Sequence, residues 1–309
     1  WDIKAWLFST GIEHQPGPEP PADPADIWEW GTEQDRSLIA SCSNVTCGET
    51  QLEEIIMDDE SDFQFLQEVS AVPKVAANLK AILGEAGKAS FFGPLDPNVK
   101  AHNLGGVGAV AKKSQHRLIH LKPLSDEFKE AELNGRVMHF GMGTTSGRVI
   151  SVFVIYGFSG GAGNKGQAHK TDHIFKAIQK ERTMSPMGPC AIMGDINCDP
   201  EHLKTLSHML RAEGWTDVGA VADRWNQPKG EYTCVTAGAN QATRRDYIFT
   251  NAELTPMVRN FRVVHDNNMP THSTLEIRFD LGTYSTTTRT VKSPLSIYNL
   301  MRSNAVGAE

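Results

Sequence analysis

Short apolar runs separated by polar turns recur along residues 38–281. Runs of this kind that are rich in β-branched or aromatic residues predict buried strands. The pattern predicts strands over residues 38–40, 63–66, 105–112, 117–121, 136–141, 149–156, 190–193, 246–249, 259–265 and 274–280.

Helical spacing of apolar residues appears between several of these strands. It predicts helices over residues 50–57, 69–83, 169–181 and 201–213. No internal repeat is visible. Two mixed sheets packed face to face, with helices outside, account for this order of elements and predict an α/β fold.

Polar side chains follow the predicted strand at 190–193. Asp195 and Asn197 belong to the sequence Gly194-Asp195-Ile196-Asn197. Two residues apart at a strand end, they point the same way. A carboxylate beside a carboxamide can hold a divalent cation or orient a water, which hydrolysis of a phosphate ester requires. Taken alone, the same pair is also typical of a simple turn.

Five other strand ends carry polar groups of the same kind. They are Asn44 in Asn44-Val45, Glu68 in Gln67-Glu68, Tyr156 in Tyr156-Gly157, Asp246 in Asp246-Tyr247-Ile248, and His272 in Thr271-His272-Ser273. In this order the six motifs resemble the endonuclease/exonuclease/phosphatase superfamily, whose pattern runs N-V, Q-E, Y-G, G-D-x-N, D-Y-I and S-D-H. The resemblance covers residues 38–281 and implies a four-layer α/β sandwich with two packed mixed β-sheets flanked by helices.

The resemblance also implies a role for each matched residue. Glu68 and Asn44 would hold the metal, and hard oxygen ligands favour Mg²⁺ or Mn²⁺. Asp195, Asn197, Tyr156, Asp246 and His272 would be catalytic, with Asp195 orienting or deprotonating the attacking water. The neighbouring Arg244 and Arg245 are positioned in sequence to meet a phosphate, and we assign substrate binding to Arg245.

One residue departs from the family pattern. Thr271 stands where the family has an Asp that fixes the orientation of the catalytic imidazole. A threonine brings no charge, so Asp246 or Asp266 would have to replace that carboxylate.

Composition limits the class of protein. Hydrophobic residues make up 39% of the chain and charged residues 22%, as in ordinary globular proteins. The five cysteines are odd in number and include no C-x-x-C pair, which argues against a disulfide framework or a zinc site. With no visible signal peptide, we expect an intracellular protein, in the nucleus if it cuts genomic DNA.

The net charge of −7 is unusual for a nucleic-acid enzyme. Residues 1–37 carry eight acids and two bases, and residues 49–62 carry seven acids and no base. No Lys/Arg cluster stands out in the sequence as a DNA-binding stripe. His169 and His173 are four residues apart on a predicted helix, but without a third ligand nearby we expect a solvated face rather than a metal site.

Both ends of the chain are predicted to be linkers. Residues 1–37 are acidic and rich in proline, and residues 282–309 are rich in Ser and Thr. Residues 11–18 resemble a degenerate 2A-like ribosome-skipping peptide, with Gly11 and Gln15 replacing its Asp and Asn. Such peptides precede the endonuclease domain of some non-LTR retrotransposons.

We therefore expect residues 38–281 to form a Mg²⁺-dependent phosphodiesterase, most simply an endonuclease that nicks DNA by in-line attack of water. Two alternatives stay open. One is a phosphatase of a small substrate such as an inositol phosphate, which an acidic surface would tolerate better. The other is a decayed, non-catalytic domain that binds nucleic acid or a partner, as the substitution at Thr271 suggests.

Overall fold

The computed structural model describes residues 37–45, 49–98, 105–113, 116–144, 149–185, 188–235, 242–265, 269 and 271–281. The predicted linkers lie outside these residues, except for Ser37, which begins the first strand. None of the described helices combines the length and the hydrophobicity needed to cross a bilayer.

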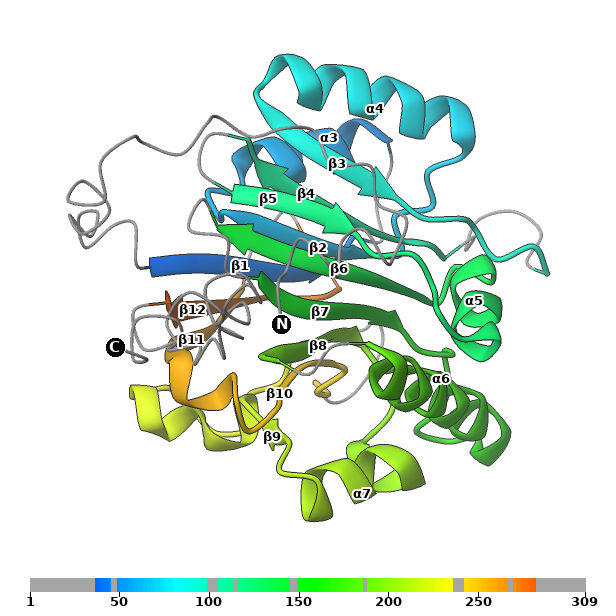
Figure 1. Ribbon diagram of the computed structural model, residues 1–309, viewed down its shortest axis with the longest axis vertical. Helices are drawn as coiled ribbons and strands as arrows, with labels where there is room; N and C mark the ends of the chain where they lie inside the picture. The colour runs from blue at the N-terminus through cyan, green and yellow to red at the C-terminus, as the bar shows by residue number, and fades with distance from the viewer. Residues whose placement is uncertain are drawn as a thin grey trace, which may run out of the picture. The chain divides into compact units, whose positions relative to one another are not determined.

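Two six-stranded sheets form the centre of the fold (Figure 1). The first sheet has the order β11 (Val258–Val264), β12 (Thr274–Asp280), β1 (Ser37–Asn44), β2 (Phe63–Gln67), β4 (Val107–Lys112) and β3 (Lys88–Phe92). The second has the order β5 (His116–His120), β6 (Val137–Thr144), β7 (Val149–Tyr156), β8 (Cys190–Asp195), β10 (Asp246–Thr250) and β9 (Thr216–Asp217). The pairs β1/β2 and β7/β8 are parallel and the other named pairs are antiparallel, so both sheets are mixed.

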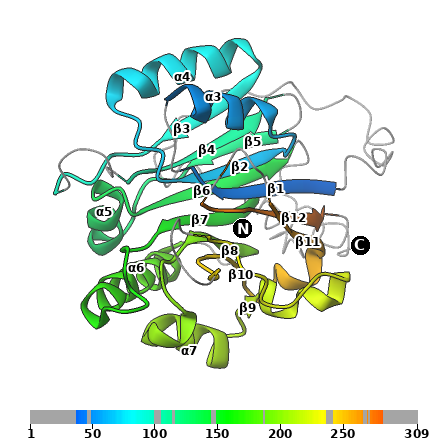
Figure 2. The ribbon, with the colours of Figure 1, turned by 180° about the vertical axis from the view of Figure 1, so that it is seen from behind.

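Helices cover the outer face of each sheet (Figures 1 and 2). The helices α3 (Glu49–Asp58) and α4 (Pro73–Glu85) pack through Leu52, Ile56 and Leu79 onto Leu66 and Val110 of the first sheet. The helices α5 (Asp126–Leu133), α6 (Lys165–Met184) and α7 (Lys204–Ala212) cover the second sheet. Short 3-10 segments lie at Pro200–His202, Gly219–Trp225 and Thr255–Met257. The predicted four-layer α/β sandwich is confirmed.

Alternating side chains of both sheets fill the space between them. Phe63 and Phe65 of the first sheet meet Phe140, Val152 and Met193 of the second in one buried cluster. Complete burial of one such side chain contributes about 1.5–3 kcal/mol. A shift of one residue in strand pairing would turn these side chains away from the core. Packing therefore fixes the pairing register, and with it the position of each strand end relative to its neighbours.

Several predicted boundaries differ from the structure. The helix expected over 69–83 begins at Pro73, because Glu68 and Ser70 have φ values of 54° and 47°, outside the helical region. Strand β3 and helix α5 were not predicted, since Lys88–Phe92 is half-buried and α5 is short and acidic. Helix α6 is longer than predicted because Asn164 caps it, accepting hydrogen bonds from the backbone N–H of Gly166 and Gln167.

Candidate active site

Strand ends from the two sheets meet at one edge of the sandwich. In the first sheet, the parallel pairing of Asn44 with Gln67 places Glu68 beside the end of β1. In the second, Asp195 is the pairing partner of Tyr156 on one side and of Asp246 on the other. The strand ends that the sequence singled out are therefore neighbours.

Asp195 lies at the centre of this group and is 1% exposed. Its Oδ2 accepts hydrogen bonds from Asn44 Nδ2 at 2.9 Å and from Asn197 Nδ2 at 3.0 Å. Its Oδ1 accepts one from the backbone N–H of Asn197 at 2.8 Å. The Asn44 contact joins the two sheets, so the carboxylate orientation depends on their packing.

Two positions at the ends of β7 and β8 require glycine, Gly157 and Gly194. Gly194 has a φ of 142°, and a Cβ there would lie 2.0 Å from the carbonyl oxygen of Ile155. At Gly157 a Cβ would lie 2.4 Å from the carbonyl oxygen of Ile196. The carbonyl oxygen of Gly157 also accepts a hydrogen bond from Asn197 Nδ2 at 3.2 Å. Close backbone approach thus brings the ends of β7 and β8 together.

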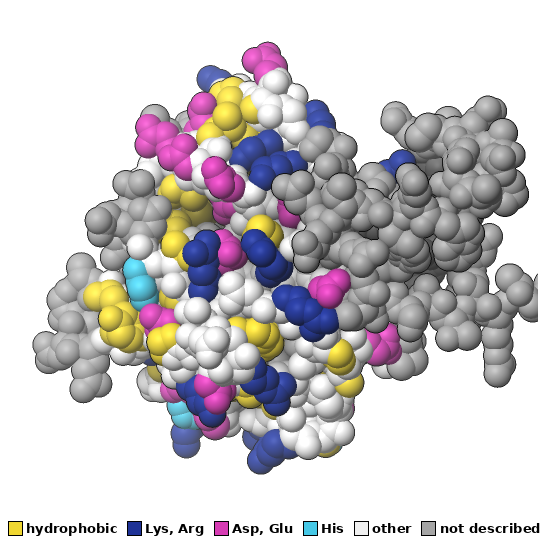
Figure 3. Space-filling model, turned by 90° about the vertical axis from the view of Figure 1, so that its left-hand side faces the viewer, with side chains coloured by type: hydrophobic (Ala, Val, Ile, Leu, Met, Phe, Trp, Pro, Cys, Tyr) yellow, Lys and Arg dark blue, Asp and Glu magenta, His cyan; other side chains and the backbone are white. Residues whose placement is uncertain are grey.

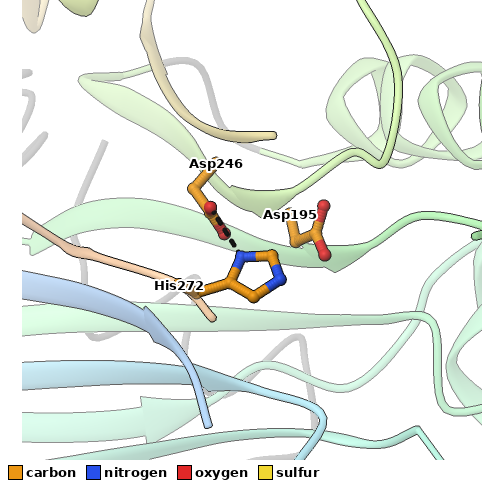
Figure 4. Close-up of side chains that lie close together, drawn as sticks. All are labelled: Asp195, Asp246 and His272. Carbon is orange, nitrogen blue, oxygen red and sulfur yellow. Dashed lines mark hydrogen bonds and ion pairs between the residues drawn. The ribbon is translucent and has the colours of Figure 1, made fainter. Parts of the chain in front are cut away.

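His272 and Asp246 form a buried hydrogen-bonded pair (Figure 4). The His272 Nδ1 lies 2.8 Å from Asp246 Oδ2, and the same oxygen accepts a hydrogen bond from Thr233 Oγ1 at 2.7 Å. The His272 Nε2 lies 3.7 Å from Cys234 Sγ. Of the two expected replacements for the family Asp at position 271, Asp246 holds the imidazole, while Asp266 lies outside the described residues.

Tyr156 donates a hydrogen bond from its hydroxyl to Glu68 Oε1, which links β7 to the residue that follows β2. Arg136 lies over the Tyr156 ring, with its guanidinium carbon 5.0 Å from the ring centroid. The Arg136 Nη1 also donates to the carbonyl oxygen of Gly157 at 3.4 Å, and its Nη2 donates to Asp96 at 2.6 Å. The buried Asp96–Arg136 ion pair therefore packs against the face of the Tyr156 ring.

Burial and neighbouring charges shift the acidities in the site. Burial, together with the charge of Asp246, raises the pKa of Asp195 to about 7. Burial disfavours the charged imidazole of His272, but the carboxylate of Asp246 outweighs it and raises that pKa to about 11. Burial and the nearby Glu68 raise the pKa of Tyr156 well above its usual range, so its hydroxyl stays a donor.

The two carboxylates of the site suit a hard divalent cation, whereas the charged imidazole of His272 is a hydrogen-bond donor and not a ligand. Side-chain polar atoms of Asp195, Asp246 and His272 lie within 4.8 Å of one another. Among the described residues, Asp246 Oδ1 is buried without a hydrogen-bond partner, which is costly unless a cation compensates it. This group does not include Glu68 or Asn44, so their role as metal ligands stays a prediction.

The two neighbouring arginines, Arg244 and Arg245, have different environments. Arg244 binds Asp217 through both terminal nitrogens, at 2.7 and 2.5 Å, and stacks on Tyr247, so it is committed to the fold. Arg245 is half-buried, and its Nη1 has no hydrogen-bond partner among the described residues. Substrate binding by Arg245 stays a prediction.

Sequence reasoning missed Thr233, Cys234, Arg136 and Asp96. None of them stands in a matched motif, and only the tertiary contacts reveal them. A groove elsewhere, lined by side chains of α3, β1, β11 and β12, contains none of the predicted site residues.

Comparisons with known proteins agree with this fold. No family model and no curated protein matches the sequence. Among solved structures, the catalytic domain of Xenopus laevis APE2 matches with a TM-score of 0.61 and 17% identity, over 79% of this chain and 92% of that chain.

Two further solved structures are similar. A Neisseria 3′ phosphatase, NExo, bound to a product DNA hairpin, matches with a TM-score of 0.56 and 15% identity, over 79% of this chain and 99% of that chain. An endonuclease/exonuclease/phosphatase from Beutenbergia cavernae matches with a TM-score of 0.57 and 16% identity, over 80% of this chain and 72% of that chain. The two packed mixed sheets, their flanking helices and these neighbours show that the chain has the fold of the endonuclease/exonuclease/phosphatase superfamily.

Proposed function

We propose that this protein is a divalent-metal-dependent phosphodiesterase that nicks DNA. The observation that carries the proposal is the hydrogen-bonded network in which Asn44, Asp195 and Asn197 lie beside the Asp246–His272 pair. A buried carboxylate held by two carboxamides, next to an oriented imidazole, is suited to hydrolysis of a phosphate ester.

Glu68 and Asn44 would hold Mg²⁺ or Mn²⁺, with the carboxylates of Asp195 and Asp246 adding negative charge nearby. When bound, the metal neutralises charge on the phosphate oxygens and stabilises the leaving oxygen. Oxygen ligands that are few in number leave room for water and substrate around such an ion.

The remaining chemistry falls to the protein's own groups. Asp195 accepts a proton from the attacking water, whose oxygen forms the new bond to phosphorus as the bond to the leaving oxygen breaks. Asn44 and Asn197 fix the orientation of that carboxylate. The protonated His272 donates a hydrogen bond to a non-bridging phosphate oxygen, while Asp246 keeps the ring in place. Tyr156 donates to another oxygen after leaving Glu68.

DNA is the proposed substrate because a structural neighbour, NExo, is described with a DNA hairpin as its product. An origin in a non-LTR retroelement rests on the 2A-like residues 11–18 alone. We retain it as part of the proposal, because a DNA-nicking domain after such a peptide fits that setting.

Phosphatase activity on a small substrate is the second candidate. It is favoured by the acidic stretch at 49–62 and by the phosphatase description of NExo. The non-catalytic alternative loses support, because Asp246 orients His272 although Thr271 lacks a charge.

A nicking assay on supercoiled plasmid tests the proposal. Relaxation in Mg²⁺ or Mn²⁺, none in EDTA, and loss of activity in Asp195→Asn would support a nuclease. The exposed Asp223, paired with Lys229 at 2.9 Å, provides the matched control Asp223→Asn, which should retain activity. Phosphate release from an inositol phosphate without nicking would favour the phosphatase, and no hydrolysis of either substrate would refute both.

A further inference from the structure

Helix α6 carries a stripe of three lysines and two histidines that the sequence pattern did not reveal. Lys165, His169, His173, Lys176 and Lys180 are all exposed. At about 100° per residue, they fall within an arc of about 80° on the helix surface. From first to last they span roughly 22 Å at a rise of about 1.5 Å per residue. We call these five residues the α6 stripe.

The stripe has no exposed acid on its own helix to neutralise it. The two acids of α6 are Asp172 and Glu181, which are 3% and 0% exposed. Asp172 accepts hydrogen bonds from the N–H and hydroxyl of Thr205, and Glu181 accepts them from Leu124 and Ser125. Both carboxylates therefore cap neighbouring helices instead of pairing with the outward lysines, apart from a 3.9 Å contact between Lys176 and Asp172.

The α6 stripe lies on a chain that carries excess negative charge. The chain has a net charge of −7, and the face seen in Figure 3 carries acidic and basic side chains next to one another. Helix α6 lies between α5 and α7 on the outer side of the second sheet (Figures 1 and 2). Its exposed ridge is thus a local positive strip on an acidic protein.

The histidine pair does not turn this stripe into a metal site. The Nε2 atoms of His169 and His173 lie 3.0 Å apart, close enough to share an ion. However, three lysines occupy the same arc, so a divalent cation would be repelled. The positive electrostatic potential of the stripe's lysines favours binding of an anion.

The stripe begins beside the candidate active site. The loop from β7 to α6 packs on the turn that carries Asn197, where a Cβ on Gly161 would lie 3.1 Å from the Asn197 carbonyl oxygen. The N–H of Phe158 donates to Thr171 Oγ1 at 2.9 Å, which ties this loop to the helix. The start of α6 is therefore held at the edge of the site, and the stripe leads away from it.

We propose that the α6 stripe is a docking surface for the phosphate backbone of a nucleic acid, extending substrate contact beyond the active site. This inference rests on the proposed function for its choice of partner. The phosphates of a nucleic acid repeat evenly and can each contact a lysine of the stripe. When lysines neutralise phosphates, the counterions of the nucleic acid are released, so the affinity depends on salt concentration. A stripe of this length would follow about six base-pair steps at 3.4 Å each.

The test is a binding titration on the full chain in EDTA, so that no cleavage occurs. A labelled DNA duplex is titrated at several salt concentrations with wild type and with Lys165→Gln/Lys176→Gln/Lys180→Gln. We expect about tenfold or greater loss of affinity at 0.1 M salt. The slope of log K against log salt is negative. Its magnitude should decrease by up to about 2.7 in the stripe variant, or about 0.9 for each lost phosphate contact.

A matched control removes three exposed lysines elsewhere. Lys74→Gln/Lys80→Gln/Lys129→Gln changes the net charge equally on α4 and α5. It should keep the wild-type slope. Equal losses in both triple variants would mean that only net charge matters and would overturn the proposal, as would unchanged binding in the stripe variant.

Hydrolysis of bis(4-nitrophenyl) phosphate separates this inference from the proposed function. The stripe variant should cleave the small ester at the wild-type rate while binding DNA weakly. If no form of the protein cleaves DNA or the ester, the phosphodiesterase proposal fails, but the titration still decides the docking surface. Weaker binding to phosphatidylserine vesicles with unchanged DNA binding would identify a membrane as the partner and refute the nucleic acid.

Discussion

At the scale of single residues, the orientation of His272 depends on one carboxylate from a neighbouring strand. Asp246 accepts from the imidazole and is itself held by the Thr233 hydroxyl. The Thr271 carbonyl oxygen accepts a backbone hydrogen bond from Val235. The imidazole is therefore oriented without an acid at position 271.

This arrangement predicts unequal effects of two substitutions. Asp246→Asn should lower kcat by about 10²- to 10⁴-fold, because His272 loses the partner that keeps it protonated and aligned. Thr271→Asp should change kcat by less than about tenfold. Steady-state kinetics of both variants checks this. A large gain in Thr271→Asp would mean that Asp246 does not suffice.

Glu68 provides the test of the metal assignment. Glu68→Gln should abolish hydrolysis in Mg²⁺ with little loss of thermal stability, since the shape of the side chain is kept while one charge on the metal is lost. Isothermal titration with Mn²⁺ should show weaker binding. Near-wild-type turnover and metal affinity would remove Glu68 from the ligand set.

His139 predicts a pH dependence of stability away from the site. It is buried, stacks on Phe153 at 4.0 Å and lies 2.7 Å from Ser151 Oγ. Burial lowers its pKa to about 3. In the unfolded chain the pKa of His139 is about 6.5, so below that pH the unfolded chain binds a proton that the folded chain does not bind. The contribution of neutral His139 to the free energy of unfolding is therefore complete above pH 6.5 and is lost as the pH falls. Between pH 7 and 4.5 the loss should be about 2.7 kcal/mol.

Urea unfolding at the two pH values measures this loss. His139→Phe should remove that part of the pH dependence, whatever its effect at pH 7. The exposed His202 supplies the control His202→Gln, which should retain it. An unchanged pH dependence in His139→Phe would show that other groups cause it.

At the scale of elements, a buried ion pair supports the end of β7. Arg136 precedes β6, binds Asp96, and lies 4.2 Å from the Phe158 ring centroid and 5.0 Å from that of Tyr156. Burial raises the pKa of Asp96, but the hydrogen bonds from Arg136 and Asn98 and the positive charge of Arg136 together outweigh it and lower that pKa. This contact joins the long β3–β4 connection to the strand that presents Tyr156.

Arg136→Met should therefore cost about 3–5 kcal/mol in free energy of unfolding, because the buried Asp96 carboxylate loses its counter-charge and keeps only the hydrogen bond from the Asn98 N–H. Adding Asp96→Asn should recover part of that cost, which a double-mutant cycle measures. The exposed Arg262–Glu276 pair gives the control Arg262→Met, expected to cost about 0–1 kcal/mol. Equal costs for the two arginines would contradict the role given to burial.

At the scale of the whole molecule, the site exists only because two sheets pack together. The Asn44–Asp195 hydrogen bond crosses between them, and the core below it is formed by alternate residues of both.

Removal of residues 1–34 should leave the fold intact. The deletion takes away seven acids and one base, so affinity for DNA should hold or rise as repulsion is lost. Thermal unfolding and the same DNA titration check both expectations. A deletion that unfolds the protein would show that the segment belongs to the domain.

The sequence by itself determined most strands, most helices and the motif residues at strand ends. Their periodicity is local, and neighbouring residues suffice to produce it, as Val149–Tyr156 shows. Boundaries failed where a few residues changed the backbone, as at Glu68 and Ser70 before α4 and at Asn164 before α6. The α6 stripe escaped notice because its lysines are spread over the sequence and gather only on a helix face.

Only the tertiary structure decided which groups touch. Asn44 and Asp195 are separated by 151 residues, and Asp246 and His272 by 26. No local pattern encodes such contacts, because they arise from strand register and from the packing of one sheet on the other. The same packing buries Asp195 beside Asp246, and this burial together with the Asp246 charge raises the pKa of Asp195.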